Sequence, residues 1–116
     1  MNTKKINQLQ ARIDRIKEKV LLIDKMRPGS LSKQYNVCGN PTCRCKDPDN
    51  PKKHGPYFQL SYSRKGKSTS EFVIKEMVAD VKKEIKNYQN FKKLMDEWID
   101  LSMKIDRLRK EEYKNK

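Results

Sequence analysis

The sequence is poor in the residues that build a wide hydrophobic core or a membrane span. Only 34% of its 116 residues are hydrophobic, whereas 37% are charged. No stretch approaches the ~20 consecutive apolar residues that cross a bilayer, and the first apolar run is interrupted by charges. We therefore expect a cytoplasmic protein with neither a signal peptide nor a membrane contact. Its length fits one domain, and so small a core calls for support from a metal or a partner chain.

Cysteine and histidine are also scarce, with three cysteines and one histidine in the chain. An odd number of cysteines does not suit a disulfide framework, whereas thiolates in a reducing cytoplasm suit a metal site. The sequence has no phosphate-binding glycine loop, no histidine-based triad and no motif of paired carboxylates. Near its centre the only acidic residues are Asp47, Asp49 and Glu71. We therefore expect that the protein is not an enzyme.

Positive charge is abundant, because 28 Lys and Arg against 15 Asp and Glu give a net charge of +13. The imbalance is greatest in residues 27–73, which carry nine basic and three acidic residues. Such a surface attracts phosphate polymers through counterion release and long-range steering. The alternative interpretation is a lysine-rich surface that only contacts solvent.

Two segments have helical periodicity, residues 1–26 and residues 74–116. The first predicts a helix over about 4–25, ended by Pro28 and Gly29. Its heptad seam contains Ile6, Leu9, Ile13, Ile16, Val20 and Ile23. The second predicts a long helix over about 74–113 with two apolar stripes whose registers differ, by a stutter or by a break. The stripes are Val78, Val81, Ile85 and Tyr88, then Leu94, Trp98, Leu101, Ile105 and Leu108.

These helices predict an antiparallel coiled-coil stalk in which the first helix returns along the last. The last helix is the longer one, so we expect its distal stripe, with Trp98 and Leu101, to lack a partner within the chain. This predicts a homodimer formed through the helices. A helix that bends back over its own stripe is the alternative.

The centre of the chain, residues 27–73, predicts a small head between the helices. Residues 30–56 are rich in proline and glycine and are expected to form a loop. Residues 57–73 predict a β-hairpin with a turn at Lys65 and Gly66. The fold class expected is therefore mainly α with a small β-hairpin.

Three cysteines and the only histidine share the predicted loop, as Cys38, Cys43, Cys45 and His54. Thiolate and imidazole are the usual ligands of tetrahedral zinc, and metal binding supplies the order that such a loop lacks. With four protein ligands the ion has no open position, which favours a structural role. Three reduced thiols beside a surface histidine, an iron–sulfur cluster and a redox switch are the alternatives.

Several motifs carry a resemblance: Met26-Arg27-Pro28-Gly29-Ser30-Leu31-Ser32, Cys38-Gly39 followed by Cys43 and Cys45, His54-Gly55-Pro56-Tyr57-Phe58, and Gly66-Lys67-Ser68. Over about residues 26–90 the chain resembles a family of small, basic, uncharacterised archaeal and bacterial proteins, often associated with mobile elements. The resemblance implies Cys38, Cys43, Cys45 and His54 as metal ligands and implies no activity. The N-terminal heptads are less characteristic of that family.

The head is also the candidate nucleic-acid site. Basic residues at a hairpin tip suit contacts with a phosphate backbone. An aromatic residue on a strand suits stacking on unpaired bases. Ser30, Ser32 and Gln34 are possible hydrogen-bond donors to phosphates, unless Ser30 caps a short helix. The predicted contact residues are Arg44, Lys46, Lys52, Lys53, Tyr62, Arg64, Lys65 and Lys67. Of the neighbouring aromatics, Tyr62 is expected to be exposed and Phe58 to lie in the core.

We expect DNA as the partner, with RNA as an alternative, and a location on the nucleoid. No recognition helix is evident, so specificity should be low or depend on shape, as in a chromatin-like or mobile-element accessory factor. The competing hypothesis is a protein-interaction adaptor that uses its coiled-coil helices and carries the zinc head as a rigid tip.

Overall fold

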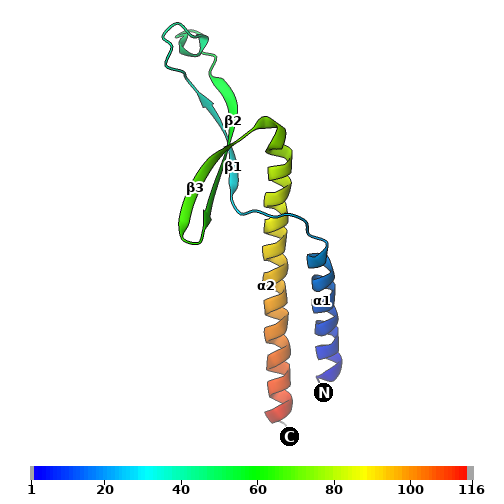
Figure 1. The fold of residues 1–116 in the computed structure, drawn as a ribbon. Helices are drawn as coiled ribbons and strands as arrows, with labels where there is room; N and C mark the ends of the chain where they lie inside the picture. The colour runs from blue at the N-terminus through cyan, green and yellow to red at the C-terminus, as the bar shows by residue number, and fades with distance from the viewer. Residues whose placement is uncertain (1, 115–116) are drawn as a thin grey trace. The chain divides into compact units, whose positions relative to one another are not determined.

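The computed structural model describes residues 2–114, which form two helices, a three-stranded sheet and two short 3-10 turns (Figure 1). The elements are α1 (Thr3–Leu21), β1 (Ser30–Asn36), η1 (Arg44–Lys46), β2 (His54–Arg64), β3 (Lys67–Val73), η2 (Lys75–Met77) and α2 (Val78–Lys114). The prediction of a shorter N-terminal and a longer C-terminal helix around a β-containing centre is confirmed. The chain forms two compact units, one from residues up to 26 and from 86 onward, the other from Arg27–Ile85.

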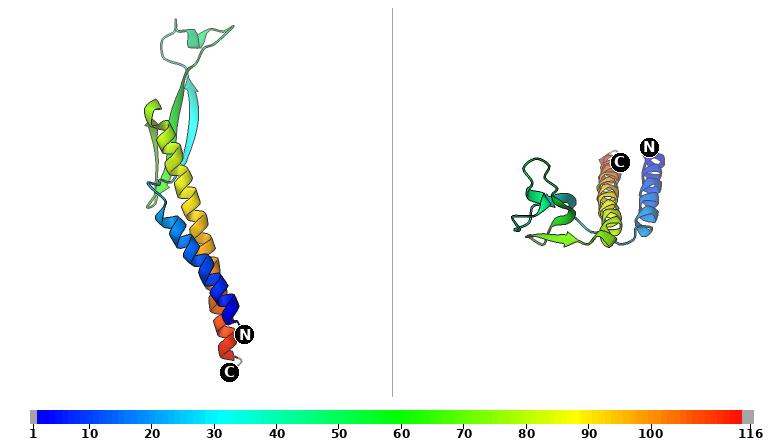
Figure 2. Two further views of the ribbon diagram at one scale, coloured as in Figure 1. Left: turned by 90° about the vertical axis from the view of Figure 1, so that its right-hand side faces the viewer. Right: turned by 90° about the horizontal axis from the view of Figure 1, so that it is seen from above.

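In the helical unit, α1 lies antiparallel to the C-terminal part of α2 (Figure 2). Near one end Asn2 donates to the carbonyl oxygen of Leu108 at 3.2 Å. Near the other end Asn87 donates to the carbonyl oxygen of Lys25 at 2.9 Å. The core between them consists of Leu9, Ile13 and Ile16 from α1 with Leu94 and Leu101 from α2.

The distal stripe of the long helix has a partner inside the chain. Leu101 is 2% exposed, and Trp98 packs against the core that Leu101 shares with α1. The expectation that this stripe lacks an internal partner is therefore wrong. The physical reason is that α1 covers the C-terminal part of α2, while the first turns of α2 pack on the sheet instead.

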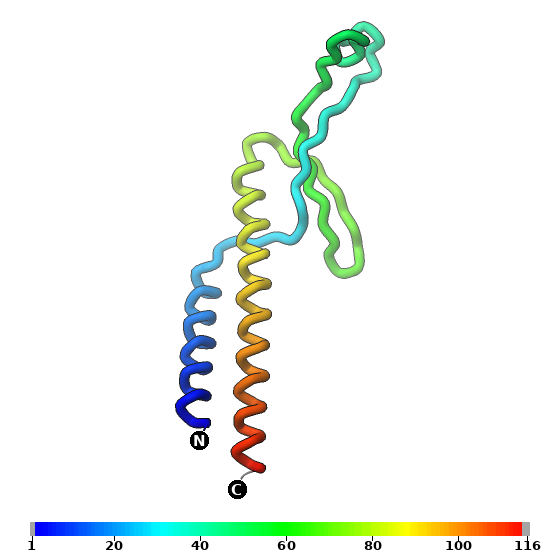
Figure 3. The backbone as a smooth tube through the Cα atoms, turned by 180° about the vertical axis from the view of Figure 1, so that it is seen from behind, coloured from blue at the N-terminus to red at the C-terminus, as the bar shows by residue number. Residues whose placement is uncertain are grey.

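In the sheet unit, β2 is the central strand and pairs antiparallel with β1 and β3 (Figure 3). Leu60 of β2 and Val81 of α2 are fully buried, and Ile85 completes their cluster. Leu31 and Val73, from the two outer strands, pack against it. This small core fixes one face of the sheet against the start of α2.

The predicted loop over residues 30–56 is wrong for its first part, because Ser30–Asn36 form β1. Ser30 therefore begins a strand and caps no helix. The strand escapes sequence-based detection because Leu31 is its only aliphatic side chain, so it has no alternating apolar pattern. Backbone pairing with β2 forms it, and the paired residues lie 18 to 31 positions further along the chain.

The long helix is continuous from Val78 to Lys114. The shift between its two stripes is therefore not a break between two helices. Val81 and Ile85 belong to the sheet core, whereas Leu94 and Leu101 belong to the helical core. The shift falls where α2 passes from one core to the other. No helix within residues 2–114 is long and apolar enough to cross a membrane.

Candidate metal centre

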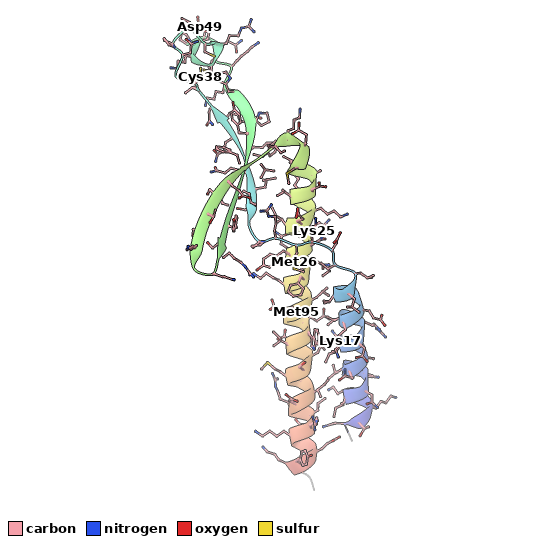
Figure 4. The ribbon with its side chains drawn as sticks, viewed as in Figure 1. Lys17, Lys25, Met26, Cys38, Asp49 and Met95 are labelled. Carbon is pink, nitrogen blue, oxygen red and sulfur yellow. The ribbon has the colours of Figure 1, made fainter. Side chains whose placement is uncertain are left out.

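The predicted metal ligands come together at one end of the sheet. Cys38, Cys43 and Cys45 belong to the loop that joins β1 to β2, and His54 is the first residue of β2. Figure 4 shows Cys38 and Asp49 in this loop, beyond the paired part of the two strands. The three sulfur atoms and a ring nitrogen of His54 lie within 4.8 Å of one another. The group is thus positioned to hold a metal ion.

Two of the distances between these atoms are close to those of a tetrahedral site. With metal–sulfur bonds of ~2.3 Å and a metal–nitrogen bond of ~2.0 Å, a zinc tetrahedron separates two sulfurs by about 3.8 Å and a sulfur and a nitrogen by about 3.5 Å. The Sγ atoms of Cys38 and Cys45 are 3.6 Å apart, and Sγ of Cys43 is 3.2 Å from Nε2 of His54. The donor set and its spacing are compatible with zinc.

Local hydrogen bonds shape the loop around the ligands. The Asn40 side chain accepts from the backbone N–H and the hydroxyl of Thr42, at 3.1 and 2.8 Å, which is the pattern of an Asx turn. The N–H of Cys43 donates to the Asn40 carbonyl oxygen at 3.2 Å. Cys43 then leads into η1, which contains Cys45. The cysteine spacing alone does not reveal this contribution of Asn40 to the shape of the loop.

Cys45 is the buried ligand, with 1% of its surface exposed. The backbone N–H of Cys38 points at its sulfur, at 3.3 Å. This hydrogen bond lowers the pKa of Cys45, but burial and the neighbouring thiols Cys38 and Cys43 outweigh it, so the pKa is raised overall. A backbone N–H directed at a sulfur atom holds that sulfur in one orientation, as a metal site requires.

The surroundings of Cys38 and Cys43 favour the thiolate form of both side chains. A backbone hydrogen bond at Asn40, followed by hydrogen bonds to His54 and Cys43, lowers the pKa of Cys38 from 9.0 to about 6. A backbone hydrogen bond at Cys45 lowers the pKa of Cys43. Hydrogen bonds to Cys38 and Cys43 raise the pKa of His54. Protons therefore compete with a metal mainly at His54 and Cys45.

Gly55 lets the strand carry His54 close to β1. Its φ of +135° is one that side-chain-bearing residues rarely adopt, and a Cβ there would lie 2.8 Å from the carbonyl oxygen of Gln34. His54 itself pairs with Asn36, two residues before Cys38. The glycine thus permits the close strand approach that places the histidine beside the cysteines.

The predicted nucleic-acid contacts divide between the two ends of β2. We call Arg44, Lys46, Lys52 and Lys53 the loop cluster, and Arg64, Lys65 and Lys67 the turn cluster; all seven side chains are exposed. The length of β2, His54–Arg64, separates the clusters by about 33 Å at ~3.3 Å per residue. The structure therefore brings together the members of each cluster and keeps the two clusters apart.

Tyr62 is not an exposed ring, so that expectation is wrong. It is half-buried and packs against the cluster of Leu60, Val81 and Ile85. Three aromatic side chains near the loop are exposed: Tyr35 on β1, Tyr57 on β2 and Phe72 on β3, at 52%, 43% and 69%. Strand alternation is the signal that distinguishes Tyr57 from Tyr62, because residues 57 and 59 face opposite to residues 58, 60 and 62.

Fold and site together define a small protein with a loop, at one end of a three-stranded antiparallel sheet, whose three cysteines and one histidine are positioned to hold a metal ion. A family model for a domain of unknown function, DUF6788, matches residues 6–83, so the chain belongs to this family. The expected membership of an uncharacterised family agrees with this match. The match begins within α1, so the N-terminal helix is part of the family pattern. No curated protein and no solved structure matches the chain.

Proposed function

We propose that this protein binds DNA with low or shape-based sequence specificity and that its loop holds a structural zinc ion. One observation carries the proposal. Of the nine cations in residues 27–73, all of which the structure describes, only Arg27 forms an ion pair, with Glu71 at 3.0 Å. The other eight are exposed, and a set of exposed, unpaired cations is the electrostatic footprint of a phosphate-binding surface.

Zinc is the metal that this ligand set suits best. Three thiolates and one imidazole match the ligands of structural zinc sites, whereas iron–sulfur clusters are usually held by four thiolates. The four protein ligands fill a tetrahedron, so the ion has no open position at which to activate water. The zinc then orders a loop that lacks a hydrophobic core and fixes the loop cluster at the end of the sheet.

The spacing of the two clusters supports a duplex as ligand. They lie about 33 Å apart by strand length, and one helical turn of B-form DNA measures ~34–36 Å. Both clusters can therefore contact phosphates on the same side of a duplex, one turn apart. Contacts of this kind position a protein without reading base edges, which accounts for low specificity.

The test is fluorescence anisotropy of a labelled ~20-bp duplex titrated with the zinc-loaded protein at several salt concentrations. We expect submicromolar affinity at low salt and a slope of log K against log salt of about −5 to −6, as for six phosphate contacts. Reversing the turn cluster with R64E/K65E/K67E should make the slope shallower by about 3.

The matched control is K104E/R107E/K110E, which removes the same charge from exposed cations of the helical unit. It should leave the slope nearly unchanged. If both triple variants shift it equally, net charge alone drives binding and the turn cluster is not the contact. If the wild-type chain fails to bind at low salt, where electrostatic attraction is strongest, the DNA-binding proposal is wrong.

A protein-interaction adaptor is the second candidate, and exposed apolar side chains on α2 favour it. Ile99 and Met103 are 56% and 51% exposed and lie about one helical turn apart. They suit coiled-coil pairing with another helix, including a second copy of this chain. A nuclease-insensitive pull-down that returns one stoichiometric protein would favour the adaptor. Analytical ultracentrifugation showing a monomer at micromolar concentration would remove the homodimer.

A further inference from the structure

The sheet face opposite Leu60 differs from the rest of the protein surface. We call it the outer face. Cross-strand pairing joins Ser30 to Ser61 and Ser61 to Ser70, so these residues share one face, and alternation extends it along each strand. The outer face carries six of the seven serines of the chain: Ser30, Ser32, Ser61, Ser63, Ser68 and Ser70.

The serines form an open ladder of hydroxyl groups. All six are exposed. Four of them pair between β2 and β3, with Oγ–Oγ distances of 3.2 Å for Ser61–Ser70 and 2.9 Å for Ser63–Ser68, and the Ser32 hydroxyl donates to the Gln59 carbonyl oxygen at 3.4 Å. Gln34 and Gln59 continue the polar surface. The outer face holds no charged side chain, although 37% of the chain is charged. Such a surface offers hydroxyl and amide donors to phosphate and sugar oxygens without repelling them.

The metal-loop end of the outer face is aromatic instead. Tyr57 and Phe72 lie on neighbouring strands as diagonal neighbours, since Gln59 pairs with Phe72. Both side chains line two shallow hollows, of 440 and 320 Å³. Exposed aromatic rings on a sheet surface are the stacking platforms on which single-strand binders place unpaired bases.

We propose that the outer face binds single-stranded nucleic acid. Bases stack on Tyr57 and Phe72, and the sugar–phosphate backbone follows the serines toward Lys65 in the turn between β2 and β3. This inference rests on the proposed function and adds a preference for unpaired strands. Charge complementarity supports it at the two ends of the face, where the loop cluster and Lys65 of the turn lie. By strand alternation Arg64 and its partner Lys67 belong to the face of Leu60. Glu71 points to the opposite face and is paired with Arg27.

The test compares a labelled 15-mer of thymidine, the corresponding uridine 15-mer and the 20-bp duplex, all with the zinc-loaded full chain at one salt concentration. Wild type should bind at least one single strand more tightly than the duplex. In Y57A/F72A we expect the affinity for the single strands to fall about tenfold or more, because base stacking on each aromatic ring strengthens binding substantially. Duplex affinity should change less than about twofold.

The matched control is Y35A, which removes another exposed tyrosine, at 52%, that lines neither hollow. It should leave both affinities unchanged. Equal losses on single strand and duplex, or an equal effect of Y35A, would overturn the inference. If the wild type binds the duplex and Y57A/F72A does not change the affinity for single strands, the inference is overturned too. The proposed function would then still stand. Failure of wild type to bind any probe would overturn both.

A measurement on the unaltered chain removes any dependence on the folding of variants. A 5-iodouracil-substituted single strand is photocrosslinked to wild type, and the modified peptide is identified by mass spectrometry. We expect the crosslink at Tyr57 or Phe72. Crosslinks confined to the helical unit would contradict the inference. The DNA and RNA versions of the probe show which sugar the face prefers.

Discussion

At the scale of single residues, the metal loop gives its three thiols different properties. Cys38 is partly exposed and its pKa is lowered to about 6. Cys45 is buried and its pKa is raised. The depressed pKa of Cys38 favours the folded, metal-free chain most fully above pH 9.0, and this contribution is lost as the pH falls toward about 6. The loop thus holds one thiolate ready for a metal near neutral pH.

We therefore predict that Cys38 of the metal-free chain reacts with iodoacetamide over an unusually acidic range. The thiolate is the nucleophile, so the alkylation rate of Cys38 should reach a plateau just above its pKa. The alkylation rate of an ordinary thiol keeps rising up to about pH 9. Mass spectrometry after timed alkylation between pH 5 and 9 measures this. Cys45 serves as the internal control and should stay slow. A Cys38 rate that keeps rising through pH 9 would contradict the prediction, and zinc should block the reaction.

At the scale of elements, α2 contributes to two cores through two stripes. Val81 and Ile85 pack in the sheet unit, while Leu94 and Leu101 pack against α1. Each stripe is covered within the chain, so neither depends on a partner for burial. A homodimer, if it forms, uses other positions such as Ile99 and Met103, which are exposed.

We predict that Leu101→Ala lowers the free energy of unfolding by about 2–5 kcal/mol, because a side chain that is 2% exposed leaves a cavity. Urea denaturation followed by circular dichroism measures the loss. Ile99→Ala is the matched control, since Ile99 is 56% exposed, and it should change stability by less than about 0.5 kcal/mol. The Leu101→Ala loss should not vary with protein concentration. A concentration-dependent loss would place Leu101 in an interface between chains.

At the scale of the whole molecule, the chain builds two separate cores, and the metal ligands belong to neither. The helical core contains Leu9, Ile13, Ile16, Leu94 and Leu101, and the sheet core contains Leu60, Val81 and Ile85. All four ligand residues lie in the sheet unit, in the loop and at the first position of β2. Metal binding should therefore order the loop without being needed for the helices.

We predict that removing the metal with a chelator loosens the loop and leaves the helices folded. Hydrogen exchange should quicken at the Cys38 amide, whose N–H points at the Cys45 sulfur, and proteases should cut within residues 37–53. The far-UV signal at 222 nm should persist, because the helical core holds no ligand. The Cys45→Ser variant should behave like the chelated wild type. Loss of most helical signal on chelation would show that the two cores unfold together.

Some features follow from the sequence alone because they depend on neighbouring residues. Heptad spacing identifies both helices, since a helix repeats every 3.6 residues wherever it packs. The ligand set is also local, because Cys38 and His54 bound a short loop that keeps all four side chains within reach of one another. Proline and glycine in the same stretch predict a loop without a core of its own, which calls for another source of order such as a metal ion.

Tertiary structure alone decided how these parts pair. It formed β1 from a segment without an apolar pattern, and it covered Leu101 with α1. The pairing of the strands places the loop cluster and the turn cluster at opposite ends of β2. It also places Tyr62 toward the core, and it brings serines from three strands onto one face with Tyr57 and Phe72. Sequence periodicity gives the faces of an element, whereas only long-range pairing determines which face is covered and which meets solvent.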